Sequence, residues 1–346
     1  MANLELSDVL VPQKFLPYML EQTAAKSDLV KSGIMQRDAE FDRLANASGG
    51  VKDGGVIKMP FWTDLSGVSQ TLNAALTTEA LTDSLDQAAK QGRGKAYSAQ
   101  DLVSKLIDLG PDGDATAVVA SRIADFWSRD DQAWLVSILK GVFAAASMAV
   151  NLSAIASEDG NNADDENKLT DLTLEDAKQL LGDRKDRLTA IAMHSATHSA
   201  LVKQQLVKYI LDPSSGAQIP FMVGGERIIV DDTLPKTAGS TSGYKYTTYL
   251  FGQGAIAWGE KDLSREAVVG GTPGSTYGVE YGRSAAAGES QVYFRRILLM
   301  HPRGVKYNQT SQVGTFPTQA ELETGTNWTR VYEAKNVRIV AVSHNN

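Results

Sequence analysis

The chain has 346 residues, no cysteine and a formal net charge of −7 at pH 7. The lack of cysteine excludes disulfides, thiolate metal sites and cysteine nucleophiles. With 41 acidic against 34 basic residues and no strongly basic cluster, the sequence does not favour tight binding to nucleic-acid phosphates. A chain of this length can bury a hydrophobic core that is stable without disulfide cross-links. Its length alone favours two domains.

The first twenty residues mix charged and apolar side chains, so we expect no signal peptide. No run of 18 or more uncharged apolar residues is present, so we expect no membrane span. The expected compartment is the cytoplasm of the cell that makes the protein, without a membrane partner.

Residues 1–48 carry scattered apolar side chains and predict an N-terminal arm of short helices with little core of its own. Glycine turns then precede a predicted strand at 56–62, and a second extended run covers 85–98. The residues between these two strands include few large apolar side chains. A stretch this poor in core residues predicts a protruding two-stranded loop that neighbours bury.

The strongest periodic signal covers residues 115–157, which contain no proline and one glycine, Gly141. Apolar residues that include Trp127, Trp134 and Ile138 recur there at steps of three, four or seven. The pattern predicts one helix, about 60 Å long at 1.5 Å per residue. We expect Trp134 to be buried beneath this helix.

Shorter elements follow along the chain. The patterns predict a helix at 172–182, a buried strand at 187–193 and a helix at 195–211. Glycine and threonine turns then separate strand-like runs at 227–230, 244–250, 255–258, 276–281, 292–300 and 337–342. The expected fold class is α+β.

Two histidines, His194 and His198, have the i, i+4 spacing that places zinc ligands on one helix face. The glutamate that such hydrolase motifs carry after the first histidine is missing, so we expect a helix start capped by Ser195 or Thr197. Asp231 ends a strand-like run, where a turn is the commoner role of aspartate. We therefore predict no catalytic residue, no cofactor and no metal, and not an enzyme.

Several segments resemble segments of one protein family, and they follow one another along this chain in the same order as in that family. They are 91–102, 191–195, 227–235, 249–255, 301–304, 317–322 and 327–339. The chain is similar to the major capsid proteins of tailed bacteriophages with the Hong Kong 97-type fold. Within that family it looks like the branch of P-twenty-two-like coat proteins.

The resemblance implies a division of the chain into five parts. They are an N-terminal arm (1–48), an extended loop or E-loop (49–100), a peripheral domain (101–185) with a spine helix at 115–157, an axial domain (186–298), and a return to the peripheral domain (299–346).

The implied function is that of a major capsid protein. It would self-assemble as pentamers and hexamers into an icosahedral head that encloses double-stranded DNA, contacted only non-specifically. Portal, scaffolding and decoration proteins are further expected partners. Phe61, Trp62, Arg93 and Lys95 of the E-loop are expected to contact neighbouring subunits, the two cations through acidic groups.

Two alternatives remain open at this point. An encapsulin-type compartment shares the fold and encloses enzymes. A metal-dependent hydrolase would use His194, His198 and Asp231.

Overall fold

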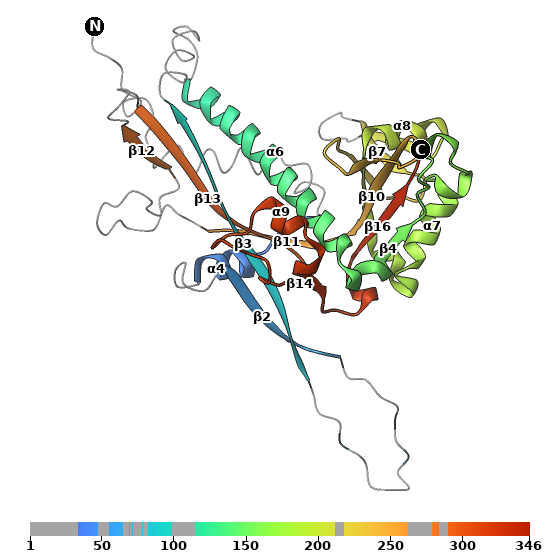
Figure 1. The fold of residues 1–346 in the computed structure, drawn as a ribbon, viewed down its shortest axis with the longest axis horizontal. Helices are drawn as coiled ribbons and strands as arrows, with labels where there is room; N and C mark the ends of the chain where they lie inside the picture. Colours follow the sequence, from blue (N-terminus) through green and yellow to red (C-terminus); the bar gives the residue numbers. More distant parts are fainter. Residues whose placement is uncertain are drawn as a thin grey trace.

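The computed structural model describes residues 34–47, 55–64, 69, 71, 78, 82–98, 115–211, 218–261, 279–283 and 290–346. Two groups of elements are evident in Figure 1: a long helix that follows extended strands, and a mixed unit to its right. Most of the predicted N-terminal arm and of the loop between the two predicted hairpin strands lies outside the described residues.

The first group is built on a six-stranded sheet. Its strands in order are β1 (Met35–Arg37), β11 (Ile256–Glu260), β13 (Ser290–Pro302), β3 (Asp83–Ser98) and β2 (Val56–Trp62), with β12 (Val279–Arg283) also paired to β13. Only β1 and β11 are parallel. The short helix α4 (Ala39–Ala47) packs on β11.

The two predicted hairpin strands are present as β2 and β3. Strand β3 pairs with β2 from Asp83 to Ala89 and with β13 from Lys90 to Ser98. The expectation that this segment lacks a core is wrong at its base, where Val56, Ile57, Ala88 and Ala89 are buried. Beyond this base the hairpin projects from the body of the molecule (Figure 1).

The long helix α6 runs from Ala115 to Ala144, shorter than the predicted 115–157. The backbone of Ala145 is extended, and the 3-10 helix η2 (Ala146–Asn151) follows. The alanine-rich sequence here contains no local stop signal. Distant contacts end the helix instead, since Ala145 and Met148 are buried in the core and Ser147 bonds to Arg330.

Gly141 explains how the C-terminal segment approaches α6. A Cβ atom at this position would overlap the backbone oxygen of Leu322 and lie 2.6 Å from Nε1 of Trp328. These two atoms are hydrogen-bonded to each other at 2.7 Å. The absence of a side chain at Gly141 therefore lets α9 (Gln319–Glu323) and β15 (Trp328–Arg330) pack directly on the helix.

The second group is an eight-stranded mixed sheet. Its order is β4 (Leu152–Ala154), β16 (Ile339–His344), β10 (Tyr244–Gly252), β5 (Leu188–Met193), β8 (Arg227–Val230), β7 (Gln218–Met222) and β6 (Val207–Leu211), with β9 (Lys236–Ala238) paired to β10. Alternate residues of β10 enter two cores, because side chains alternate along a strand. Tyr249 and Phe251 join the cluster that contains Leu139 of α6, whereas Leu250 joins Leu174 and Leu201.

Two helices cover this sheet. Helix α7 (Asp171–Gln179) begins at a capping box formed by Thr170 and Thr173. Helix α8 covers only Ser195–Lys203, so the predicted helix 195–211 is wrong in its second half. Gln205 has a φ of 61°, which ends the helical path. The β-branched and aromatic residues that follow favour strand β6.

The remaining elements are short. Strands β14 (Val305–Tyr307) and β15 form a separate two-stranded sheet. The other 3-10 turns are η3 (Gly160–Asn162), η4 (Asp165–Asn167), η5 (Gly182–Arg187), η7 (Gly325–Asn327) and η8 (Ala334–Asn336). Among the described helices, none combines the length and the apolar character that a membrane crossing requires.

Candidate interaction site at the base of the hairpin

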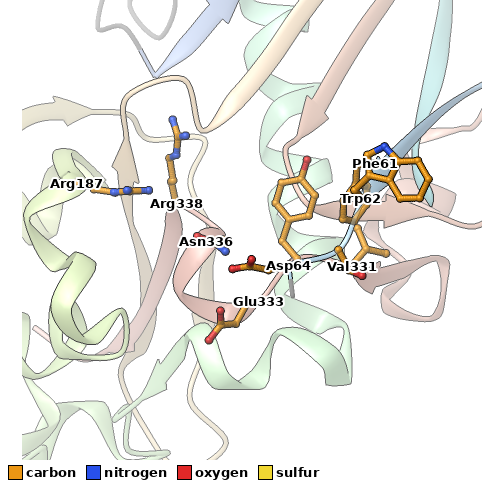
Figure 2. Close-up of a pocket in the computed structure, with 10 residues that line it drawn as sticks. Phe61, Trp62, Asp64, Arg187, Val331, Glu333, Asn336 and Arg338 are labelled. Atoms are coloured by element: carbon orange, nitrogen blue, oxygen red, sulfur yellow. The ribbon is translucent and has the colours of Figure 1, made fainter. Parts of the chain in front are cut away.

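A hollow of about 670 Å³ lies where the end of β2 meets the segment before β16 (Figure 2). It brings together residues that are distant in sequence. Its walls are formed by Phe61, Trp62, Thr63, Asp64, Arg187, Val331, Tyr332, Glu333, Asn336 and Arg338. We call this hollow the hairpin groove.

The aromatic wall of the hairpin groove contains the first two predicted contact residues. Phe61 is half-buried and meets the ring of Tyr332 edge-on, with 4.8 Å between centroids. Trp62 points to the other face of β2, as alternation requires, and is 69% exposed. A side chain with this much apolar surface in water is a strong candidate for burial by a partner.

The opposite wall carries charge. Arg187 and Arg338 are both exposed there, on the same side of the groove in Figure 2. Arg338 donates from Nη1 to the backbone oxygen of Gln253 at 3.0 Å. Among the described residues, neither arginine forms an ion pair. Burial, together with the nearby Asp86 carboxylate, raises the pKa of Tyr332, so its hydroxyl stays neutral.

The other two predicted contact residues lie further along β3. Arg93 is buried and pairs with Asp130 of α6 at 2.5 Å, and also with Asp131. These carboxylates belong to its own subunit, so contact between Arg93 and a neighbouring subunit stays a prediction. Lys95 is exposed, with Nζ 5.7 Å from the centroid of the Phe126 ring.

A buried ionic cluster surrounds Arg93. Arg296 of β13 lies directly opposite it and pairs with Glu260 at 2.8 Å and with Asp131 at 3.3 Å. Burial opposes the charge of Arg296, but Glu260 and Asp131 outweigh it and raise its pKa. Sequence reasoning missed this cluster. Its only signal was Arg295-Arg296 inside an apolar strand pattern.

The residues of the hydrolase alternative have structural roles. His194 itself caps α8, accepting at Nδ1 from the backbone nitrogen of Ala196 at 3.1 Å, so the predicted caps Ser195 and Thr197 are wrong. Asp231 accepts from the backbone nitrogen of Thr233 at 2.8 Å, which confirms the predicted turn. Burial lowers the pKa of His198. No group of three or more potential metal ligands is present in the part of the chain that the structure describes.

Comparison with known proteins identifies relatives of this architecture. The model of a Gp13-like family, described as major capsid protein 13-like, matches residues 47–265. The major capsid protein of Bacillus phage SPP1 is 36% identical over 347 residues, which cover 99% of each protein.

Solved phage capsids share the fold at low identity. The capsid of Ralstonia phage GP4 has a TM-score of 0.53 and 10% identity, over 91% of this chain and 88% of that one. The capsid asymmetric unit of cyanophage Pam1 has a TM-score of 0.52 and 10% identity, over 100% and 94%. The narrower resemblance to P-twenty-two-like coat proteins stays a prediction. The chain belongs to the Gp13-like family of phage major capsid proteins, with the Hong Kong 97-type fold, and is a subunit of an icosahedral head.

Proposed function

We propose that this capsid subunit is purely structural, and that pentamers and hexamers of it assemble in the bacterial cytoplasm. Packaged DNA is contacted only non-specifically, in keeping with the net charge of −7. Portal, scaffolding and decoration proteins are its further partners. The family relationship and the capping and turn roles of His194 and Asp231 support this over an enclosing compartment for enzymes or a hydrolase.

The proposal includes a division of labour along the chain. Residues 1–48 form the arm, 49–100 the E-loop, and 101–185 and 299–346 the peripheral domain and its return, except that we assign β4, α7 and β16 to the axial domain because they belong to the unit of the eight-stranded sheet. The remainder of the axial domain lies within 186–298, but we assign β11, β12 and β13 to the peripheral part. The pairing of β11 and β12 with β13, in the same sheet as β3, supports that assignment.

The observation that carries the proposed contact between subunits is the exposure of Trp62. It stands 69% exposed on a hairpin that projects from the body of the molecule (Figure 1). Aromatic residues are enriched at the centres of protein interfaces, where burial of one ring contributes strongly to binding. We assign Phe61 and Trp62 to a contact with the neighbouring subunit.

Lys95 and Arg93 have different parts in this contact. Lys95 is exposed and, among the described residues, forms no ion pair, so it is available to a carboxylate of the neighbour. Arg93 ties β3 to α6 through Asp130 and Asp131 and thereby sets the direction in which the hairpin projects.

The substitution Trp62→Ser tests the contact. We expect the variant to fold normally by circular dichroism but to lose shells and capsomers by sedimentation and negative-stain microscopy. Val313→Ser is the matched control, because Val313 is 95% exposed and lies outside the hairpin groove. Normal shells from Trp62→Ser at normal yield would overturn the assignment.

A further inference from the structure

Strand β6 presents an unusual amount of apolar surface. Tyr209, Ile210 and Leu211 are 51%, 55% and 63% exposed, and they lie consecutively on the last strand of the eight-stranded sheet. Because side chains alternate along a strand, both faces of β6 are exposed here. Edge strands with exposed apolar side chains readily pair or pack with another chain.

The β6–β7 hairpin is joined to the rest of its sheet mainly at its base, where Met222 of β7 is buried. Five residue pairs join β6 to β7, but β7 pairs with β8 only between Phe221 and Arg227. A hairpin of two strands is marginally stable in water unless a further surface covers it. The described residues of its own subunit therefore leave the apolar side chains of Tyr209, Ile210 and Leu211 on the outer part of the hairpin uncovered.

The charge on this hairpin is positive. Lys208 lies two residues before Ile210, so the two side chains share one face of β6. Lys203, at the end of α8, is exposed nearby in sequence. Among the described residues neither lysine forms an ion pair. A complementary surface must therefore combine an apolar side chain with carboxylates.

Helix α7 carries such a surface. Leu172 is 78% exposed, and Asp176 lies four residues later on the same helix face. Asp171 and Glu166 add negative charge next to it. Within the described chain Glu166, Asp171 and Asp176 form no ion pairs. In Figure 1, α7 lies on the outer side of this unit and β7 on the side towards α6.

The spacing of the two surfaces matches. Residues two apart on a strand, such as Lys208 and Ile210, are separated by about 6.7 Å. Residues four apart on a helix, such as Leu172 and Asp176, are separated by about 6 Å along the axis. One strand face can thus place its apolar and its cationic side chain on the apolar and the acidic side chain of one helix.

We propose that the β6–β7 hairpin of one copy docks on α7 of a second copy, with Ile210 against Leu172 and Lys208 facing Asp176. The inference rests on the proposed assembly into capsomers and adds a second contact to it. Because donor and acceptor lie on different sides of one subunit, the contact is head-to-tail. Such a contact generates a closed ring when the rotation between copies closes.

A charge exchange tests the pairing in the full-length protein. Lys208→Glu and Asp176→Lys each place like charges together, so each should lose shells and capsomers while keeping the wild-type circular dichroism. The double variant restores opposite charges and should recover assembly. Normal assembly of either single variant, or a double variant no better than the singles, would overturn the proposal.

A covalent test uses the natural absence of cysteine. In the variant Ile210→Cys with Leu172→Cys, any disulfide formed under mild oxidation within assembled shells should join separate copies and give a ladder on a non-reducing gel. Leu172→Cys with Val313→Cys is the matched control and should stay monomeric on the gel. A monomer from both variants would contradict the docking.

The cysteine pair and the variant Trp62→Ser together distinguish this inference from the proposed contact at the hairpin groove. Loss of shells in Trp62→Ser without a ladder from the cysteine pair would overturn the β6–α7 docking alone. A ladder together with normal shells from Trp62→Ser would support the docking and overturn the role of Trp62.

Discussion

Arg93 and Arg296 face each other directly across the β3–β13 ladder, although both are buried and both are positively charged. Like charges in this position repel each other and destabilise a sheet. Asp131 resolves the conflict, because its carboxylate pairs with both guanidinium groups from the overlying helix α6. The ionic cluster thus holds the helix, the hairpin strand and the central strand in one arrangement.

Asp131→Asn should therefore be strongly destabilising. The change leaves two facing cations with less compensation, and breaking a buried ionic group in this way costs about 3 to 5 kcal/mol. Asp130→Asn is the control, since among the described residues Asp130 pairs with Arg93 alone, and its side chain is more exposed than that of Asp131. Urea unfolding of both variants measures the difference. Equal losses would mean that Asp131 does not bridge the two arginines.

Truncation of the two tryptophans of α6 should destabilise the protein to different extents. Trp127 is 1% exposed, with Arg296 lying 5.2 Å over its ring, whereas Trp134 is half-buried, with Arg93 at 5.1 Å. Full burial beneath the helix was expected for Trp134, but one side of it borders a small hollow with Gly92 and Phe316. Trp127→Ala should cost about 3 to 5 kcal/mol and Trp134→Ala less. Thermal and urea unfolding give the order, which the reverse result would contradict.

In Gly141→Ala, a gain in helix propensity opposes a loss in packing. Alanine is favoured over glycine inside a helix by about 1 kcal/mol. The new Cβ, however, would overlap the backbone oxygen of Leu322 and force apart the segment that packs on α6. Overpacking of this kind costs about 1 to 3 kcal/mol, so we expect net destabilisation in urea unfolding. Lys140→Ala, which removes only a half-exposed ion pair with Glu323, should have little effect.

His344 should make stability depend on pH. Burial lowers its pKa from 6.5 to about 4, and the neutral ring bonds to Thr248 and to the backbone oxygen of Asn345. The unfolded chain gains a proton at a higher pH than the folded one. The stabilisation is therefore complete above pH 6.5 and is lost, up to about 3 kcal/mol, as pH falls towards 4.

The variant His344→Gln isolates this contribution. Carboxylates elsewhere titrate equally in both proteins, so the difference between wild type and variant reports on His344 alone. We expect the loss of unfolding free energy between pH 7 and pH 4.5 to be smaller in the variant. An identical pH profile for the two proteins would show that the ring does not titrate below its ordinary range.

Local patterns predicted the elements better than their ends. The glycine turn before Val56 and the periodicity around Ile138 predicted β2 and α6, because each signal lies within or beside the segment itself. The end of α6 depends on Arg330 and Leu322, which lie far away in sequence. No local pattern contains that information.

The residues of the candidate site also fall into those that the sequence indicates and those that only the folded chain brings together. Trp62 is an expected E-loop contact and is 69% exposed, and its contact with a neighbouring subunit stays a prediction. Arg93 lies between two glycines, and no local pattern indicates that Asp131 of α6 lies beside it. Tyr332 and Arg338 were missed because only the folded chain brings them to the end of β2.

Arg93→Glu and Lys95→Glu should therefore act through different routes. A glutamate at position 93 would be buried beside Asp130 and Asp131, where three carboxylates repel one another and leave Arg296 as the nearest cation. Removing one partner of a buried pair costs about 3 to 5 kcal/mol, so the fold itself should be damaged. Circular dichroism and urea unfolding should detect this before any assembly assay.

Lys95→Glu should leave the fold intact, because the side chain is exposed and its contact with Phe126 is worth about 0.5 to 1 kcal/mol at an exposed site. Any loss of shells from this variant then reports on a contact with another subunit. High salt should weaken wild-type assembly in the same direction, since exposed ion pairs are screened. If Lys95→Glu builds normal shells at normal yield and in the same salt range, Lys95 makes no contact that matters, and the hairpin is held through Trp62 and its backbone.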